Sequence, residues 1–129
     1  MIFGVGSDIV AIERMREMWR RHGERAPGKL LAFAERQPCC DHADPGRFLA
    51  KRFAAKEALG KALGLGMRAP VLFTAISVSH DDLGKPIFAF DSRLAGWMQA
   101  RRLLAHLSIS DEAQYAVAFV VVERQQELS

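Results

Sequence analysis

The charged side chains between residues 48 and 63 have the types and spacing most suited to chemistry. This segment is rich in Ala, Leu, Lys, Arg and Glu, which favour a helix. Four of its charges are scattered among its apolar positions instead of gathered on one wet face. They are Arg52, Lys56, Glu57 and Lys61. Since burying an unpaired charge costs several kcal/mol, these groups should face a cleft, an ion or a partner.

Two interpretations of this pattern are open. Glu57 and Lys61 stand at i and i+4, in the order that stabilises a helix by roughly 0.3–0.5 kcal/mol, so they can be a simple helix pair. The glycines that follow favour a ligand site, because Gly64 and Gly66 let backbone approach a ligand and nearby Lys and Arg suit phosphate. A helix C-terminus itself repels anions.

Asp8 is a lone carboxylate in an apolar stretch. Residues 2–6 are apolar with glycines and predict a short buried strand, which would place Ser7 and Asp8 at its end. A carboxylate there can cap a helix or a turn. It can also take part in chemistry, because functional groups commonly lie at strand ends.

Residues 12 to about 25 predict an amphipathic helix with a basic outer face. Ile12, Met15 and Trp19 recur at helical spacing and should face the core. The opposite side carries Arg14, Met18, Arg21 and Arg25. Arg binds carboxylates through two nitrogens and Met supplies adaptable apolar area, so this side can either dock an acidic helix or simply be solvated.

The rest of the chain predicts short helices and strands. The expected elements are a short helix at 29–35 ended by Pro38, a polar connection at 37–46, strands at 71–78 and 86–90, a helix from Asp91 or Ser92 to Arg101, and strands at 106–110 and 115–122. Pro45 and Gly46 should open the helix at 48–63, and Gly64 should end it. The almost continuously apolar run at 116–122 predicts a central strand.

Two further histidines have alternative interpretations. His42, with Asp41 and Asp44, belongs either to a metal cluster or to a surface loop. His106, near Ser108 in an expected strand, is either a hydrogen-bonded structural residue or a catalytic one.

Length and composition limit the possible protein classes. The chain has 129 residues, is 50% hydrophobic and carries a net charge of +3, which predicts one soluble domain with an acidic partner or a phosphorylated ligand. Cys39 and Cys40 are adjacent and lack zinc-motif companions, so we expect a reducing, cytoplasmic setting. We expect no targeting segment and no membrane span.

Together these fragments resemble one family, the bacterial holo-acyl-carrier-protein synthases, which are small 4′-phosphopantetheinyl transferases. The resemblance spans nearly the whole chain. It runs from residues 2–8 with Arg14, through the block RFAAKEA at 52–58 with Lys61, Ala62 and Gly64, to Gly84-Lys85-Pro86, residues 106–110 and Tyr115-Ala116. The RFAAKEA block combined with the Gly6-Ser7-Asp8 segment is its most specific part.

The resemblance implies a fold, an activity and partners. The fold would be α+β, a single domain over residues 1–129 with an antiparallel or mixed sheet and a long central helix, usually assembled as a homotrimer with shared coenzyme sites. The activity would be transfer of 4′-phosphopantetheine from coenzyme A to a serine of apo acyl carrier protein, with release of adenosine 3′,5′-bisphosphate. The setting would be cytoplasmic lipid metabolism such as fatty acid biosynthesis, although a polyketide carrier is an equal alternative.

The resemblance also implies residue roles. Asp8 and Glu57 match the family's metal-binding pair for Mg²⁺, an ion that takes oxygen ligands and can neutralise phosphates. With Lys61 they would form the catalytic set. The coenzyme would contact Arg52, Lys61, Gly64, Gly84, Lys85, Pro86 and His106. The carrier would contact Arg14, Met18, Arg21 and Arg25.

Small departures from the family pattern and one rival function accompany this resemblance. Asp111 stands where many relatives have histidine, and Leu65 with Met67-Arg68 replaces the frequent Thr and Ile. The rival is a non-catalytic binding module that grips an acidic protein through the arginine-rich helix. Nucleic acid is not an expected partner, because the aromatic residues fit a core better than base stacking.

Overall fold

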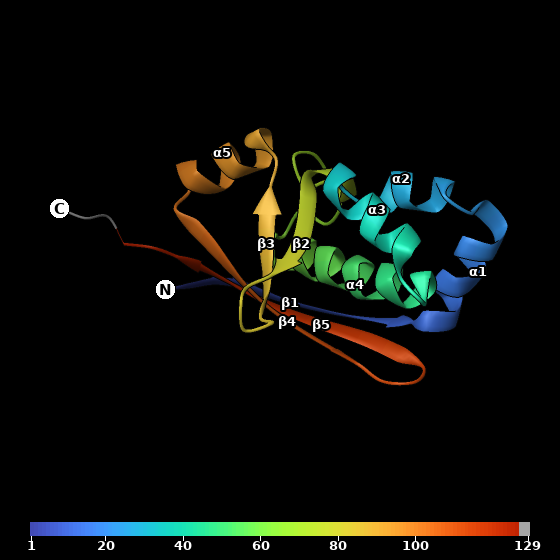
Figure 1. Ribbon diagram of the computed structural model, residues 1–129. Helices are drawn as coiled ribbons and strands as arrows, with labels where there is room; N and C mark the ends of the chain where they lie inside the picture. Colours follow the sequence, from blue (N-terminus) through green and yellow to red (C-terminus); the bar gives the residue numbers. More distant parts are fainter. Residues whose placement is uncertain (127–129) are drawn as a thin grey trace.

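A long helix lying across an antiparallel sheet defines the architecture (Figure 1). The computed structural model describes residues 1–126. The helix is α4 (Pro45–Leu63), and the sheet has the order β1-β5-β4. These strands are β1 (Ile2–Ala11), β5 (Tyr115–Arg124) and β4 (Leu103–Asp111). The predicted α+β class is confirmed, with β5 in the central position expected of the apolar run.

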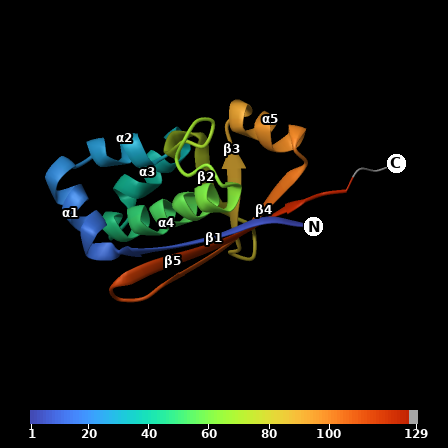
Figure 2. The same cartoon turned by 180° about the vertical axis from the view of Figure 1, so that it is seen from behind.

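The remaining elements surround α4 at both ends. Three helices gather around its N-terminal half: α1 (Ile12–His22), α2 (Arg25–Leu30) and α3 (Phe33–Asp41). Strands β2 (Ile76–His80) and β3 (Pro86–Phe90) form a separate antiparallel pair, preceded by the short 3-10 helix η1 (Phe73–Ala75). Helix α5 (Ser92–Ala100) follows β3, at the opposite end of the molecule from α1 (Figure 2). Within residues 1–126, no helix is both long and apolar enough to cross a membrane.

Local capping chemistry sets the bounds of α4, as predicted. The side chain of Asp44 accepts a hydrogen bond from the backbone nitrogen of Arg47, and Pro45 occupies the first turn. At the other end Gly64 adopts a left-handed conformation with φ of 77°, which only glycine takes up without strain.

Two glycines of β1 allow α4 to lie directly on this strand. A Cβ atom on Gly6 would lie 2.0 Å from the carbonyl oxygen of Ala58, and one on Gly4 would lie 2.0 Å from that of Ala62. Neither position accepts a side chain at this separation of helix and strand. The small residues therefore set the distance between β1 and α4.

Strand β5 alternates strictly between the two faces of the sheet. Ala116, Ala118, Val120 and Val122 are buried toward α4. Val117 and Phe119 remain 38% and 47% exposed on the other face. The continuous apolar run thus supplies one face of the core and one bare apolar face.

The predicted end of the first strand is wrong. Strand β1 continues past Asp8 to Ala11, and Asp8 pairs with Ala118 in the middle of the ladder. The polar Ser7 and Asp8 suggest a strand end when considered locally. Pairing with β5 extends to Ala11↔Tyr115, and this long-range partner decides the length of the strand.

The predicted helix at 29–35 and the loop at 37–46 are also wrong. Helix α2 ends at Leu30, and α3 runs through Pro38 to Asp41. The side chain of Glu35 accepts a hydrogen bond from the backbone nitrogen of Ala32, and Cys39 is completely buried. These contacts hold α3 together despite the proline.

One strand boundary is also corrected, and His42 fits one of its two interpretations. The strand expected at 71–78 begins only at Ile76, because η1 precedes it. His42 accepts a hydrogen bond from the backbone nitrogen of Asp44, as expected of a loop residue. No group of three or more metal-ligand side chains occurs among residues 1–126.

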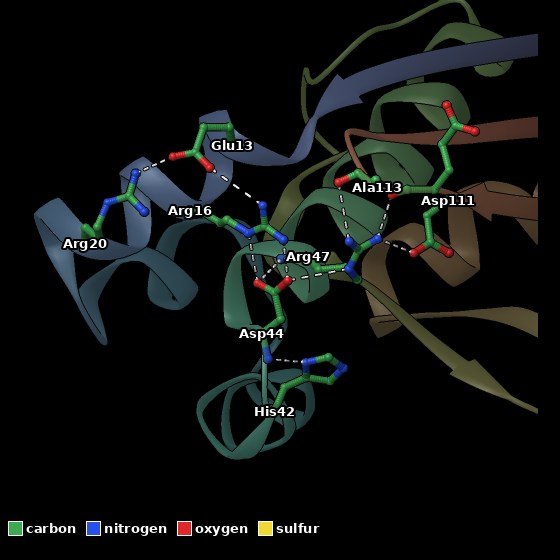
Figure 3. A network of polar contacts seen from close by, with 9 residues as sticks. Glu13, Arg16, Arg20, His42, Asp44, Arg47, Asp111 and Ala113 are labelled. Carbon is green, nitrogen blue, oxygen red and sulfur yellow. Dashed lines mark hydrogen bonds and ion pairs between the residues drawn. The ribbon is translucent and has the colours of Figure 1, made fainter.

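A polar network ties α1 and the β4–β5 hairpin to the start of α4 (Figure 3). Arg16 donates to Asp44 at 2.7 Å, and Arg47 donates to Asp111 at 2.7 Å. Arg47 also donates to the carbonyl oxygens of Glu112 and Ala113. Asp111, a departure from the family pattern, therefore has a structural partner on α4.

This network should make stability depend on pH through Asp44. The hydrogen bond from Arg16 lowers the pKa of Asp44 from 3.8 to about 2, so the stabilisation is complete above the unfolded pKa and is lost as pH falls toward 2. Asp44→Asn keeps a capping oxygen but loses the charge, and should lower the free energy of unfolding at pH 7 by about 1 kcal/mol. Urea unfolding at pH 7, 5 and 3 measures this difference.

The difference between Asp44→Asn and the unmodified chain should shrink below about pH 4. A difference that stays constant from pH 7 to pH 3 would contradict an ionic contribution of Asp44. Asp81→Asn, a change in the turn between β2 and β3 that lies outside this network, is the control.

Candidate active site

Asp8 and Glu57, called the carboxylate pair below, meet where β1 crosses α4. Asp8 follows Gly6 by two residues and so points from the same face of β1 toward the helix. Its Oδ1 accepts a hydrogen bond from Nζ of Lys61 at 3.2 Å. Its Oδ2 is buried and has no hydrogen-bond partner among residues 1–126. A buried carboxylate oxygen without a donor is the kind of atom that a bound cation would satisfy.

The electrostatics of Glu57 show that the two carboxylates are close enough to interact. Burial raises the pKa of Glu57, and the negative charge of Asp8 raises it further. The positive charges of Lys61 and Arg14 oppose this rise. Two carboxylates that repel each other fit a divalent cation with oxygen ligands, such as Mg²⁺.

Lys61 connects the helix to the strand. Its Nζ donates to the backbone oxygen of Ser7 at 2.9 Å as well as to Asp8, while 53% of its side chain is exposed. The interpretation of Glu57 and Lys61 as a simple helix pair does not describe these contacts. Lys61 is held at the edge of the carboxylate pair, with part of its side chain open to solvent.

Arg52 and Lys56 face a partner within the chain that the sequence did not indicate. Both donate to Glu35 of α3, at 3.0 Å and 2.6 Å respectively. Burial lowers the pKa of Lys56 to about 8, although the nearby Glu35 favours its charged form. The expectation that these charges need a partner is met, while the coenzyme contact of Arg52 stays a prediction. No local signal marked Glu35 for this role, because it was expected at the end of a helix at 29–35, whereas the structure places it in the first turn of α3.

The residues expected to bind a carrier lie around two adjoining hollows. Arg14, Met18 and Arg21 line one on α1, and Met18 also lines a second of about 340 Å³ together with Arg25 of α2. Arg25 was expected at the end of the first helix, but α1 ends at His22 and Arg25 begins α2. The four residues still share one surface, called the docking face below.

Part of the expected coenzyme set gathers at a different place. Lys85, Pro86 and His106 line a groove of about 260 Å³ between β3 and β4, with Gly84 in the adjoining turn at φ of 85°. Because β5 separates β1 from β4, this groove and the carboxylate pair lie at opposite edges of the sheet. His106 is 2.9 Å from Glu123 and 47% exposed. Gly64 lies elsewhere, at the end of α4 beyond Lys61.

Comparison with known proteins identifies the family. Residues 4–120 match the model of the 4′-phosphopantetheinyl transferase superfamily. A holo-[acyl-carrier-protein] synthase of Dechloromonas aromatica is 58% identical over 123 residues, which cover 95% of this chain and 98% of the relative. The chain belongs to the 4′-phosphopantetheinyl transferase superfamily. The family inferred from the sequence is confirmed, and membership in this family of enzymes favours catalysis over the rival binding module.

Further relatives and solved structures match this transferase over nearly its full length. A holo-[acyl-carrier-protein] synthase of Aromatoleum aromaticum is 50% identical, covering 97% of this chain and 100% of the relative. The crystal structure of the holo-[acyl-carrier-protein] synthase from Neisseria meningitidis has a TM-score of 0.91 at 40% identity, covering 96% and 100% of the two chains. The Bacillus anthracis synthase in complex with CoA (3′,5′-ADP) has a TM-score of 0.81 at 35% identity, covering 97% and 99%.

Removing the charge of Glu57 should stabilise the metal-free transferase at neutral pH. A raised pKa means that the folded state holds the proton of Glu57 more tightly than the unfolded chain, so ionisation lowers stability as pH rises through these values. Glu57→Gln avoids that cost and should raise the unfolding midpoint at pH 7.5 by about 3 °C. Thermal unfolding with a chelator present is the measurement.

The rise in the unfolding midpoint caused by Glu57→Gln should disappear near pH 4, where the unmodified residue is protonated in the folded state. Glu112→Gln, an exposed carboxylate on the β4–β5 turn, should show no such pH-dependent gain. If Glu57→Gln is less stable than the unmodified chain at pH 7.5, the ionised carboxylate of Glu57 does not destabilise the fold.

Proposed function

We propose that this transferase moves the 4′-phosphopantetheine of coenzyme A onto a serine hydroxyl of an apo acyl carrier protein, releasing adenosine 3′,5′-bisphosphate. The observation that carries this proposal is the carboxylate pair with Lys61, where β1 meets α4. Relatives named holo-[acyl-carrier-protein] synthase support the carrier, and the Bacillus anthracis complex supports the coenzyme.

Asp8 and Glu57 would hold Mg²⁺. The unpartnered Oδ2 of Asp8 and the raised pKa of Glu57 are both consistent with this ion. When bound, a divalent cation supplies neutralisation of phosphate charge and polarisation of the phosphorus under attack. Protein carboxylates usually share such an ion with substrate phosphates and water, and two carboxylates suit that arrangement.

Lys61 would contribute positive charge toward the coenzyme phosphates. Its Nζ is oriented by Ser7 and Asp8, and its exposed part can donate to a phosphate oxygen. Gly64 lies one turn further on, and among residues 1–126 no atom other than those of its chain neighbours lies within 4 Å of the position its Cβ would occupy. A phosphorylated ligand could therefore approach the backbone at the end of α4.

The docking face would bind the acidic helix of the carrier. Arg14 links it to the chemistry, because its guanidinium lies 5.4 Å from the ring centre of Phe53 and its charge acts on Glu57. A carrier helix laid on α1 would thus hold its serine loop close to the carboxylate pair. Arg residues suit this task because they bind carboxylates through two nitrogens.

We propose a homotrimer in which each coenzyme site is shared between neighbours. The outer face of the sheet supports an assembly, since it exposes the apolar side chains Phe3, Val5, Ile9, Leu104, Tyr115, Val117 and Phe119. The groove near His106 and the carboxylate pair lie at opposite edges of one sheet. A site shared between neighbouring copies of the chain would bring these two parts together on one coenzyme.

The remaining parts of the proposal concern setting and domain organisation. We propose a single transferase domain over residues 1–129, and the family match over residues 4–120 supports this. We also propose a cytoplasmic setting in lipid metabolism, with fatty acid biosynthesis as the first pathway to test. The free thiols of Cys39 and Cys40 are consistent with a reducing compartment.

The transfer itself is tested by intact-mass analysis of an apo acyl carrier protein incubated with coenzyme A and the transferase. We expect a gain of one phosphopantetheine with Mg²⁺ and no gain with chelator. Asp8→Asn and Glu57→Gln should each slow the transfer at least about 100-fold, because each removes an expected ligand of the ion. Asp41→Asn, at the end of α3, is the matched control.

Circular dichroism of each variant checks whether a loss of turnover comes from a loss of folding. Full turnover by both Asp8→Asn and Glu57→Gln would reject the metal assignment. No transfer by the unmodified protein to several carriers would reject the proposed reaction itself.

Phe119→Arg should disrupt the assembly. This change places a charge in the centre of the outer sheet face, where a subunit contact would have to desolvate it. Light scattering after size exclusion should give a trimer for the unmodified chain and a smaller species for the variant. Phe33→Arg, at a side chain that is 83% exposed on α3, is the control and should remain trimeric.

A mixing experiment tests whether the sites are shared. Asp8→Asn and Lys85→Glu alter opposite edges of the sheet. Each variant alone should be inactive. Refolded together, the two should recover part of the activity, because some sites then combine an intact edge from each chain. An absence of recovery in mixed trimers would place the whole site within one chain.

A further inference from the structure

Lys56 is a completely buried lysine that the proposed chemistry does not use. Its side chain is 0% exposed, and its Nζ makes three hydrogen bonds. It donates to Oε1 of Glu35 at 2.6 Å, to the carbonyl oxygen of Leu30 at 2.9 Å and to that of Phe73 at 2.9 Å. The ammonium group thereby joins α4 to the last residue of α2, to the first residue of η1 and to the first turn of α3.

Glu35 is as fully bonded as Lys56. Besides Lys56, its Oε1 accepts from the backbone nitrogen of Ala32, and its Oε2 accepts from Arg52 and from the backbone nitrogen of Val78. Arg52 also donates to the carbonyl oxygen of Val78 at 3.1 Å. The geometry of this cluster leaves the Lys56 ammonium little freedom, so the carbonyl groups that it binds are held firmly.

The hydrogen bond from Lys56 to the carbonyl oxygen of Phe73 is the one with a consequence for function. The ring of Phe73 stacks on Phe53, with 5.4 Å between ring centres and an interplanar angle of 16°. Phe53 lies one helical turn before Glu57, on the same side of α4. The guanidinium of Arg14 lies 5.4 Å from the Phe53 ring. This stack, called the aromatic step below, therefore lies between the docking face and the carboxylate pair.

We propose that Lys56 is a positioning residue that holds the aromatic step in the place where the incoming carrier protein contacts it. Held by Glu35, Lys56 fixes the backbone of Phe73 and so the placement of its ring against Phe53. The inference rests on the proposed function, because a carrier on the docking face has to pass its serine over this step to reach Glu57. Both rings are partly exposed and can contact the carrier directly.

A purely structural role accounts less well for these contacts. Replacing a buried ion pair by apolar side chains of similar size is often neutral or stabilising, so stability alone does not require Lys56 and Glu35. An apolar side chain at position 56 would leave the carbonyl groups of Leu30 and Phe73 without this donor. The specific effect of the lysine is to hold these backbone segments in place.

The test is Lys56→Met, assayed by transfer to an acyl carrier protein well below the unfolding temperature of each variant. We expect the KM for the carrier to rise about tenfold, while the Kd for coenzyme A, measured by calorimetry without carrier, changes less than about twofold. Lys51→Met makes the same substitution on the same helix, near Asp111 and not Phe73, and should change neither value.

A second variant shows whether Lys56 acts through the aromatic step. Phe73→Leu removes the ring and leaves the bonds of Lys56 to the backbone in place, so it should raise the carrier KM by a similar factor. When Lys56→Met is added to Phe73→Leu, the KM for the carrier should rise by less than about a further twofold, because the ring that Lys56 positions is already missing.

Each result decides the inference. An unchanged carrier KM in Lys56→Met, or an equal further rise in the Phe73→Leu background, would overturn it. If Lys56→Met does not fold, an unchanged carrier KM in Phe73→Leu alone overturns it. Turnover by the unmodified protein in the same assay tests the proposed function separately.

Discussion

The close approach of α4 to β1 is the constraint on which the site depends. The backbone of β1 at Gly4 and Gly6 lies so close to the carbonyl groups of Ala62 and Ala58 that neither glycine has room for a Cβ atom. This approach allows a carboxylate from a strand and one from a helix to share a single charged environment. A larger residue at Gly6 would move the helix away and separate the carboxylate pair. Two glycines thus decide the geometry of the carboxylate pair.

Successive residues of α4 serve opposite purposes. Lys56 points to Glu35 and has all its hydrogen bonds satisfied within the protein. Glu57 lies one residue and about 100° further around the helix, where burial and the negative charge of Asp8 raise its pKa. Satisfied charges hold the helix in place, while the under-satisfied carboxylates remain available for a ligand.

The sheet separates two kinds of surface. Its inner face carries Asp8 and the small residues that seat α4, whereas its outer face carries exposed apolar side chains and His106. Since the groove near His106 and the carboxylate pair lie at opposite edges, the fold of one chain holds only parts of the expected coenzyme surface together. Assembly of several chains would join these parts.

Local chemistry in the sequence determined the elements whose signals are contained within a few residues. Pro45 and Gly64 bound α4 as predicted, because capping depends on neighbouring backbone groups. Alternation and apolar runs located β3 and β5. The carboxylate pair was predicted only through family resemblance, since no periodicity relates Asp8 to Glu57.

Tertiary structure decided what long-range partners control. Pairing with β5 carried β1 beyond Asp8, and buried contacts of Glu35 and Cys39 kept α3 helical through Pro38. Glu35 became the partner of Lys56 only because folding brings α3 against α4. Hydrogen bonds and burial between distant segments depend on where the backbone lies in space. Local propensity cannot predict them, because it depends only on neighbouring residues.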